Sequence, residues 1–523
     1  MNKNKLKWIV LGLACILAVL VLILGRKGRG HEEDNQEKAG YESVYVSCKD
    51  MPSLQIRPCR AENTEDDTLF LFLPFAEQRY VWNVPDGMHL YVNTKPCETG
   101  DEMEELVPGE RYLFAIEEGG EFTDAHYLMC MKGDRIPAIS LTIGEEKLNG
   151  IVTEDYPLHM EQAGFRIYDV DENGGLREDC HTTCTTGGHG NSTWLNDKKS
   201  FEFDTGIPIS PLGMADSVKW NLIANGMDRS LVKNRIVYEA ACSTNMEYSI
   251  DCRYVNCYIN GIYQGLYLLT EKPETAYGSY MMEFKQYDPN IVANMTDPWF
   301  YTSMTSDSEG NNYMVRIKYP PNVNARETAY LKEYVNETER ALYSEGGVDQ
   351  DTGLDFHERM DMYSWAMSYL FLDFFAYQDS SAGSLFFYKK RNDKLLYSGP
   401  VWDYDKSMTD DFVAVDDFPW YGRGAIYLWY ERLDGFEDFH DQVVGNYKDE
   451  LSPAVDEIIE TKLPAWMKEI ESSEAMDDIR WNRGIGYGEM HTKDVQEWLT
   501  KRKELFDAVW IRGEESPYAE NIY

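Results

Sequence analysis

The sequence is poor in basic residues and in histidine. Its 523 residues hold 50 Lys and Arg against 90 Asp and Glu, a formal net charge of −40, and only 9 His. A surface this acidic repels phosphate backbones, which argues against nucleic acid as a partner. It favours metal ions or basic protein substrates, or it serves solubility alone. A metal-dependent hydrolase is disfavoured because such sites usually use His ligands.

The apolar run from Trp8 to Leu24 is short for a membrane span, and no small-x-small cleavage site follows it. At about 17 residues it is still near the minimum length for a span and long for a signal-peptide core. Basic residues flank both of its sides. We therefore predict an uncleaved signal-anchor at residues 1–25 and a charged linker at 26–42. The chain would be a single-pass membrane protein with its bulk outside the cytoplasm.

Nine cysteines lie outside the apolar run, an odd number that leaves at least one unpaired. An exported location would permit disulfides among the others. Cys180, His181, Cys184 and His189 form a local cluster, but their spacing matches no common zinc site. We therefore do not predict zinc there.

Short apolar runs broken by turns fill residues 43–133, a pattern typical of a small β-sandwich. This segment carries no catalytic constellation, so we interpret it as a spacer or binding module. A β-rich region begins at 134 and becomes helical after Asp355. The sequence thus predicts an α+β protein with a main domain at 134–450 and a helical extension at 451–523.

Two hairpins and one helix are predicted within the main domain. Asn260-Gly261 lies between two alternating apolar runs, and both positions of such a turn favour a positive φ. A second hairpin joins residues 385–388 to 394–397. The segment 359–375 is apolar on nearly every face, which indicates a core helix.

The second hairpin places one acidic loop before its first strand and another after its second. Its ends fold back, so Asp379 and Asp403 come near each other. Two close carboxylates are costly unless a proton or a cation lies between them. Metal-assisted phosphoryl transfer uses this arrangement, with one Asp as base and the other holding Mg²⁺. Alternatively, Asp379 caps a turn and the residues Asp403 and Asp405 are surface charges.

A glycine-rich segment between two predicted strands contains Gly190, Asn191 and Ser192, and Lys198 and Lys199 follow it. Backbone N–H groups in such a loop can bind an anion, and a following Lys can reach the same phosphates. Glycines more often mark ordinary turns, so this motif alone is weak.

Several stretches in this order resemble the CotH family, the spore-coat-H-type atypical protein kinases. They span roughly residues 137 to 450 and comprise Gly190-Asn191-Ser192-Thr193-Trp194 with Lys198-Lys199, Trp220 to Asn225 with Asp228-Arg229-Ser230 and Lys233-Asn234, Asn260 to Tyr267 with Glu271, and Asp379 through Trp402-Asp403-Tyr404-Asp405.

The resemblance implies a protein-kinase-like fold with a β-rich N-lobe, a helical C-lobe and ATP between them. It implies Asp379 as the catalytic base and Asp403 as a ligand of Mg²⁺ or Mn²⁺. Asp405 would be a second metal ligand or would brace the loop. The nucleotide-binding residues implied by it are Lys198, Lys199, Gly190, Asn191, Ser192 and Glu271.

One departure from the family pattern affects the metal site. Kinases carry an Asn five residues after the catalytic Asp, where it holds the second metal ion. This sequence has Ser384 there, a shorter and weaker ligand. The resemblance therefore supports two hypotheses. The first is a membrane-anchored kinase acting on Ser or Thr of surface or coat proteins. The second is a weak or inactive kinase-like protein that binds or assembles partners at the cell surface.

Overall fold

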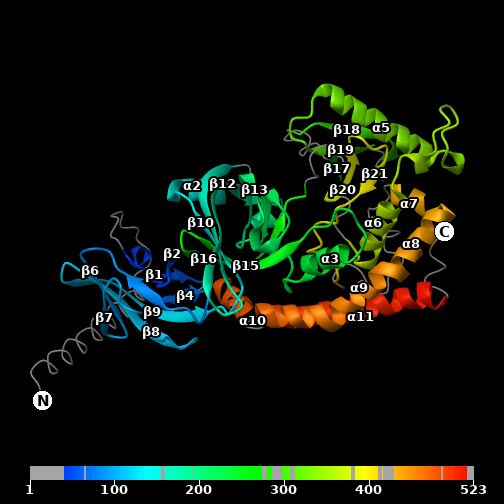
Figure 1. Ribbon diagram of the computed structural model, residues 1–523. Coiled ribbons are helices and arrows are strands. Elements are labelled where there is room, and N and C mark those ends of the chain that lie inside the picture. Colours follow the sequence, from blue (N-terminus) through cyan, green and yellow to red (C-terminus); the bar gives the residue numbers. More distant parts are fainter. Residues whose placement is uncertain are drawn as a thin grey trace, which may run out of the picture. The chain divides into compact units, whose positions relative to one another are not determined.

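The structure is a computed structural model, and it describes residues 40–63, 66–154, 159–190, 192–273, 279–285, 297–306, 312–377, 383–409, 415, 429–484 and 487–514. The chain forms two compact units (Figure 1). Unit 1 comprises residues 1–226, 253–269 and 468–488, and unit 2 comprises 227–252, 270–467 and 489–523. Both contain sheets and helices, which confirms the predicted α+β class. The two-lobed kinase-like arrangement stays a prediction.

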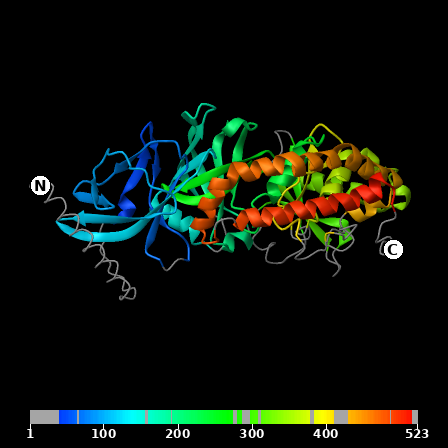
Figure 2. The same ribbon diagram turned by 90° about the horizontal axis from the view of Figure 1, so that it is seen from below.

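Unit 1 begins with two sheets, one of three strands in the order β2-β1-β5 and one of six in the order β3-β4-β9-β8-β6-β7. The long strands β8 and β9 lie side by side in Figure 2. The strands are β1 (Tyr45–Cys48), β2 (Met51–Ile56), β3 (Cys59–Arg60), β4 (Thr68–Leu73), β5 (Tyr80–Asn83), β6 (Met88–Val92), β7 (Lys95–Cys97), β8 (Arg111–Glu118) and β9 (Glu121–Lys132).

A closed barrel follows in the same unit, in the order β10-β11-β12-β13-β14-β16-β15. Parallel pairing of β10 with β15 closes it. Tyr258 of the barrel donates a hydrogen bond to the Phe72 carbonyl at 2.9 Å, so the barrel packs on the first sheets. Its elements are β10 (Ala138–Thr142), α2 (Glu145–Val152), β11 (Met160–Val170), β12 (Leu176–His189), β13 (Ser200–Ile209), β14 (Ser217–Ile223), β15 (Cys252–Ile259) and β16 (Ile262–Glu271).

The turn between β15 and β16 is the one predicted from Asn260-Gly261. Their φ angles are 52° and 81°, the left-handed values that Asn and Gly tolerate best. The Asn260 side chain also accepts from the Ile143 N–H and donates to the Ile143 carbonyl, each at 2.8 Å. This turn is therefore tied to the end of β10.

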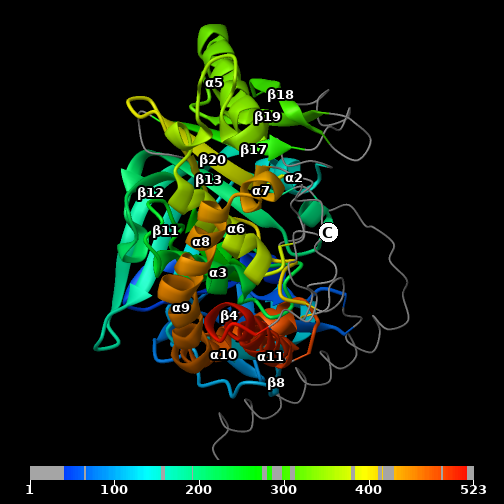
Figure 3. The ribbon, with the colours of Figure 1, turned by 90° about the vertical axis from the view of Figure 1, so that its right-hand side faces the viewer.

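Unit 2 is built on a sheet in the order β18-β19-β17-β20-β21. Its strands are β17 (Ser279–Lys285), β18 (Trp299–Ser306), β19 (Asn312–Tyr319), β20 (Leu385–Lys390) and β21 (Leu396–Ser398). Helix α5 (Ala325–Tyr343) lies over β18 and β19 (Figure 3). It begins at a capping box in which Asn324 and Glu327 satisfy each other's backbone N–H groups.

Helix α6 (Met362–Phe374) is the core helix predicted at 359–375. Nearly all of its residues are buried, including Trp365, whose ring packs 5.3 Å from that of Trp429. Asp361 caps its start by accepting from the Ser364 N–H. The other helices are α3 (Lys233–Cys242), α7 (Trp429–Asp434), α8 (Glu437–Asn446), α9 (Ser452–Glu457), α10 (Leu463–Arg480) and α11 (Tyr487–Phe506).

No helix within the described part of the chain is long and apolar enough to cross a membrane. The predicted anchor at 1–25 and most of the linker at 26–42 lie outside the described residues. The anchor, the extracytoplasmic location and the domain boundaries stay predictions.

Candidate functional site

The hairpin of β20 and β21 brings together two segments that the sequence singled out. Tyr388 pairs with Tyr397 across the hairpin, as the antiparallel prediction requires. The chain leaves β21 at Ser398 and runs back toward the start of β20, so residues 383–384 lie close to 403. Asp379, the predicted base, lies outside the described residues.

Ser384 and Asp403 are in direct contact. The Ser384 hydroxyl donates to Asp403 Oδ2 at 3.0 Å. Both residues have left-handed backbones, with φ of 65° and 69°. Non-glycine residues rarely adopt this region, and each such backbone costs on the order of 1–3 kcal/mol unless the surroundings enforce it. Strain of this kind gathers at functional sites, which marks this pair as a site candidate.

A buried carboxylate on the neighbouring strand holds Ser384 from its other side. The Ser384 N–H donates to Glu283 Oε1 at 2.9 Å, and Lys285 Nζ lies 3.4 Å from the same oxygen. Arg316 Nη1 lies 3.9 Å from Glu283 Oε2. Burial alone would raise the pKa of Glu283, but the charges of Lys285, Lys318 and Arg316 outweigh it and lower that pKa. Glu283 therefore stays ionised beside Ser384, within a group of cations that also includes the Arg316–Asp297 ion pair.

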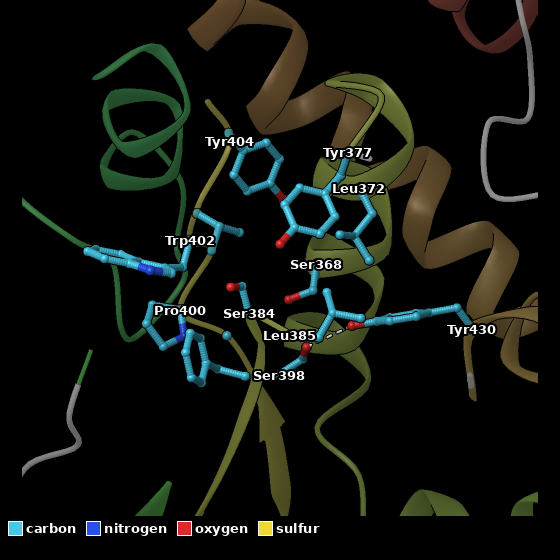
Figure 4. Close-up of a pocket in the computed structure, with 13 residues that line it drawn as sticks. Ser368, Leu372, Tyr377, Ser384, Leu385, Ser398, Pro400, Trp402, Tyr404 and Tyr430 are labelled. Carbon is cyan, nitrogen blue, oxygen red and sulfur yellow. Dashed lines mark hydrogen bonds between the residues drawn. The ribbon is translucent and has the colours of Figure 1, made fainter. Parts of the chain in front are cut away.

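A small cavity of about 20 Å³ lies between α6 and the segment after β21 (Figure 4). Ser384, Trp402, Tyr377 and Tyr404 contribute to its lining. The rings of Tyr377 and Tyr404 lie 4.7 Å apart. A volume of this size suits a water molecule rather than a nucleotide. The cavity therefore belongs to the support of the Ser384–Asp403 pair.

Helix α3 anchors the acidic loop. Its Asn234 side chain accepts from the Tyr404 N–H at 2.8 Å, and the Tyr238 ring stacks on Trp402 at 5.6 Å. Burial raises the pKa of Tyr238 well above its ordinary value, and the charges of Asp403 and Asp405 add to this effect. The carboxylates of Asp403 and Asp405 therefore both lie near the Tyr238 hydroxyl. Asp405 is buried.

Lys198 lies in unit 1, where it forms a buried ion pair. Its Nζ lies 2.9 Å from Asp477 Oδ1, donates to the Leu266 carbonyl at 2.6 Å and sits 4.9 Å from the centre of the Tyr267 ring. Burial lowers the pKa of Lys198, and Asp477 opposes that effect. An internal ion pair with a carboxylate is also how protein kinases hold their phosphate-contacting Lys.

Lys199 and the glycine-rich turn occupy the same unit. Lys199 Nζ donates to the Trp194 carbonyl at 2.8 Å and lies 4.6 Å from the centre of that ring. Gly190 has a φ of 108°, and a side chain there would overlap Thr193 Oγ1. Ser192 begins a short 3-10 turn, and Asn191 lies outside the described residues.

A family model described as "CotH kinase protein" matches residues 188–506, which is more than half of the chain. The chain belongs to the CotH family. The resemblance drawn from the sequence motifs is thereby confirmed. A search of curated proteins found no match to the chain.

In this CotH protein the predicted site residues divide between the two units. Ser384, Asp403, Asp405 and Glu271 belong to unit 2, and the structure joins the first two by a hydrogen bond. Lys198 belongs to unit 1 with Lys199, Gly190 and Ser192. Burial and then the charge of Asp251 raise the pKa of Glu271 to about 7.

The side-chain oxygens of Asp403 and Ser384 would make up only part of a magnesium coordination shell. Among the described residues no group of three or more His, Cys, Asp and Glu could hold a metal, and Cys180 with its neighbours is no exception. Magnesium, however, usually takes one or two carboxylates and completes its shell with phosphate and water oxygens. Asp403 with Ser384 supplies such a partial set, and Lys285 supplies positive charge on the same side.

Three functional partners were missed by reasoning from the sequence. Glu283 precedes Ser384 by 101 residues, and Asp477 follows Lys198 by 279. The motif Lys233-Asn234 indicates a family resemblance but not the contact of Asn234 with Tyr404. The alternation of β17 shows that Glu283 and Lys285 share one face, but only strand pairing reveals that this face meets Ser384.

Proposed function

We propose that this CotH protein is a protein kinase that transfers the γ-phosphoryl group of ATP to Ser or Thr hydroxyls of surface or coat proteins. Asp403 and Ser384, with Asp405 beside them, would hold the divalent metal, Mg²⁺ or Mn²⁺. The metal, when bound, neutralises charge on the phosphates. Asp379 would accept the proton of the acceptor hydroxyl.

The contact between Ser384 and Asp403 carries this proposal. Asp403, the metal-binding candidate, is hydrogen-bonded to Ser384, which by the family resemblance corresponds to the Asn that holds the second metal in kinases. The ammonium group of Lys285 lies 3.4 Å from Glu283, the carboxylate that holds Ser384, and a cation at this position favours phosphate. Family membership supports the same chemistry.

The family resemblance also implies nucleotide-binding residues within unit 1. Lys198 would contact the phosphates, with Lys199 beside it and Gly190, Asn191 and Ser192 in the covering turn. Glu271 would also belong to the nucleotide-binding set. A signal-anchor would keep the kinase at the membrane, facing protein substrates outside the cytoplasm. This placement rests on the apolar run at 8–24.

A specific observation also favours the second candidate, a weak or inactive kinase-like protein that binds or assembles partners. The Ser384 hydroxyl donates a hydrogen bond to Asp403 Oδ2, and only its single oxygen remains to bind a second metal ion. A serine oxygen also reaches less far than the amide oxygen of Asn. Slow phosphoryl transfer or nucleotide binding alone would follow.

A thermal-shift titration of the full-length chain with ATP and either Mg²⁺ or Mn²⁺ tests the site. A ligand at 100 times its Kd stabilises by about 2.7 kcal/mol, enough for a shift of a few degrees. We expect a metal-dependent shift that Asp403→Asn abolishes. Asn suits the left-handed backbone at this position, so the variant tests charge rather than strain. An equal shift in the variant would show that Asp403 is not the metal ligand.

Two further variants separate binding from turnover. Asp441→Asn removes one exposed charge from α8 and should behave as wild type. Asp379→Asn should retain the thermal shift and lose phosphate transfer to protein. Unchanged transfer would remove Asp379 from the role of base. Binding without transfer in the wild type would favour the second candidate.

A further inference from the structure

Unit 2 contains a second, larger cavity that the proposed kinase chemistry does not use. Its volume is about 160 Å³, and Ser398 of β21 lines both this cavity and the small one beside Ser384. The residues that give it its chemical character are four tyrosines and two acids: Tyr248, Tyr363, Tyr388, Tyr397, Glu247 and Asp361. We call it the tyrosine pocket.

The aromatic rings of the tyrosine pocket are fixed by one another. The ring of Tyr388 stacks on Tyr397 with centroids 5.1 Å apart, and the edge of Tyr248 meets Tyr388 at 6.3 Å. Cross-strand pairing of β20 with β21 sets the first contact. The faces of such rings carry negative potential, which attracts cations.

Tyr388 brings a polar group into this aromatic wall. The residue is 5% exposed, and its hydroxyl makes no hydrogen bond to any residue that the structure describes. Burial raises the pKa of Tyr388, and the charges of Glu247 and Asp361 raise it further. The hydroxyl oxygen itself is not sealed from solvent, so a ligand or water in the cavity can reach it.

The carboxylates give the tyrosine pocket a negative charge. Glu247 and Asp361 line it, and Glu450 lies behind it, where it accepts from the Tyr363 hydroxyl at 2.7 Å. One of these carboxylates already pairs with a cation of the same chain. Lys390 Nζ donates to Glu247 at 2.5 Å and lies 4.4 Å from the centre of the Tyr397 ring. This exposed rim pair is weak enough to yield to a competing cation.

We propose that the tyrosine pocket binds an alkylammonium or guanidinium group. Aromatic faces, a free phenol oxygen and two carboxylates supply the cation–π contact, the hydrogen-bond acceptor and the counter-charge that such a group needs. Two sources have this chemistry, a free polyamine and a Lys or Arg side chain of a bound protein. The site stands independently of kinase activity.

A cation bound in the tyrosine pocket would affect residues at the Ser384 side of the hairpin. One face of β20 carries the alternate residues Phe386, Tyr388 and Lys390. On the neighbouring strand β17, Glu283 lies directly opposite Phe386. Glu283 in turn accepts from the Ser384 N–H. The tyrosine pocket and the proposed metal site are therefore connected through the pairing of β20 with β17.

Saturation-transfer NMR on the full-length chain tests the proposal at millimolar affinity. The probes are spermidine, N-acetyl-lysine methylamide and N-acetyl-arginine methylamide, with N-acetyl-norleucine methylamide as the neutral match. We expect the cationic probes to bind more tightly than the norleucine compound. Equal binding of the neutral probe would overturn the proposal.

Variants at the pocket give opposite expected changes. Glu247→Gln with Asp361→Asn should weaken binding about tenfold, because two counter-charges are lost. Asn caps a helix as well as Asp, so α6 should be preserved. Lys390→Gln should tighten binding severalfold, because it removes the competing cation. Unchanged affinity in the double variant, or weaker binding after Lys390→Gln, would contradict the assignment.

Two controls keep these outcomes interpretable. Glu437→Gln with Asp441→Asn removes two exposed charges from α8 and should leave binding unchanged. If the double variant unfolds, Glu247→Gln alone, at an exposed position, should still weaken binding. Tighter binding of spermidine would assign the site to a polyamine, and tighter binding of the blocked amino acids would assign it to a protein side chain. Both results support the pocket.

Discussion

Ser384 is the residue at which this CotH protein departs from the kinase pattern in the proposed metal site. Its N–H is held by Glu283 and its hydroxyl by Asp403, so both ends of the residue are committed. Its φ of 65° is one that serine seldom adopts and that Asn adopts several times more readily. The backbone therefore still has the conformation that suits the residue found in kinases.

We predict that Ser384→Asn increases metal-dependent phosphate transfer by about tenfold or more. An amide oxygen would extend the ligand set, and a bound metal contributes several kcal/mol of charge stabilisation. The measurement is transfer of labelled phosphate from ATP to protein at matched Mg²⁺ concentrations. Ser384→Ala is the control and should not gain. Equal rates in all three proteins would show that this position does not limit the reaction.

Glu271 should give the protein a measurable pH dependence of stability. Its pKa is about 7 in the folded chain, above the ordinary 4.5, because of burial and Asp251. As pH rises from about 4.5 to about 7, the unfolded chain ionises first, so the free energy of unfolding falls. Below that window the stabilisation is fully present, and above it the loss is complete.

We predict that Glu271→Gln stabilises the protein by roughly 1–3 kcal/mol at pH 8 relative to its effect at pH 4.5, because each pKa unit is worth about 1.4 kcal/mol. Thermal melts of both proteins across this range provide the measurement. A constant difference between the two melting curves would mean that Glu271 does not titrate with a raised pKa.

At the scale of elements, the sequence pattern predicted the features that depend only on residues close together in the chain. The Asn260-Gly261 turn, the buried helix α6 and the hairpin of β20 and β21 follow from turn chemistry and periodicity. Contacts between distant segments could not be predicted in this way. Parallel pairing of β10 with β15 joins residues more than 100 apart, and the bond from Ser384 to Glu283 depends on the register of β17. Register is set by packing of whole strands, which one strand's residues do not encode.

The hairpin of β15 and β16 allows a prediction about a single turn. Gly261→Ala should destabilise the protein by about 1–3 kcal/mol, because a side chain at φ of 81° is strained and its Cβ would lie 3.2 Å from the Gln55 carbonyl oxygen. Gly353→Ala is the matched control, since its φ is 72° and its Cβ would meet nothing within 4 Å. Urea unfolding should show the larger loss at 261. Equal losses would mean that the positive φ alone, and not contact with Gln55, determines the destabilisation.

At the scale of the whole molecule, the chain does not divide into consecutive blocks. Unit 1 regains residues 253–269 and 468–488 after the chain has entered unit 2. Prediction from composition assigns contiguous domains, because hydropathy and turn signals report only neighbours in sequence. Asp477, in the second half of α10, therefore forms an ion pair with Lys198, and no local sequence signal predicts this contact.

The net charge of −40 is a property of the whole chain, and it should limit stability at low salt. Like charges repel one another in the compact state, and salt screens them with a Debye length that falls from about 30 Å at 0.01 M to about 10 Å at 0.1 M. Exposed ion pairs such as Lys95–Glu104 lose little by the same screening, because each is worth at most about 1 kcal/mol.

We therefore predict that the melting temperature at pH 7.5 rises by a few degrees between 10 and 300 mM NaCl, on the order expected for one or two kcal/mol. The control is the same titration near pH 4.6, the pI of the sequence, where net repulsion vanishes and the rise should disappear. A rise of the same size at both pH values would assign the effect to salting-out of apolar surface rather than to charge. A fall at pH 7.5 would mean that attraction within ion pairs outweighs the repulsion of the whole molecule.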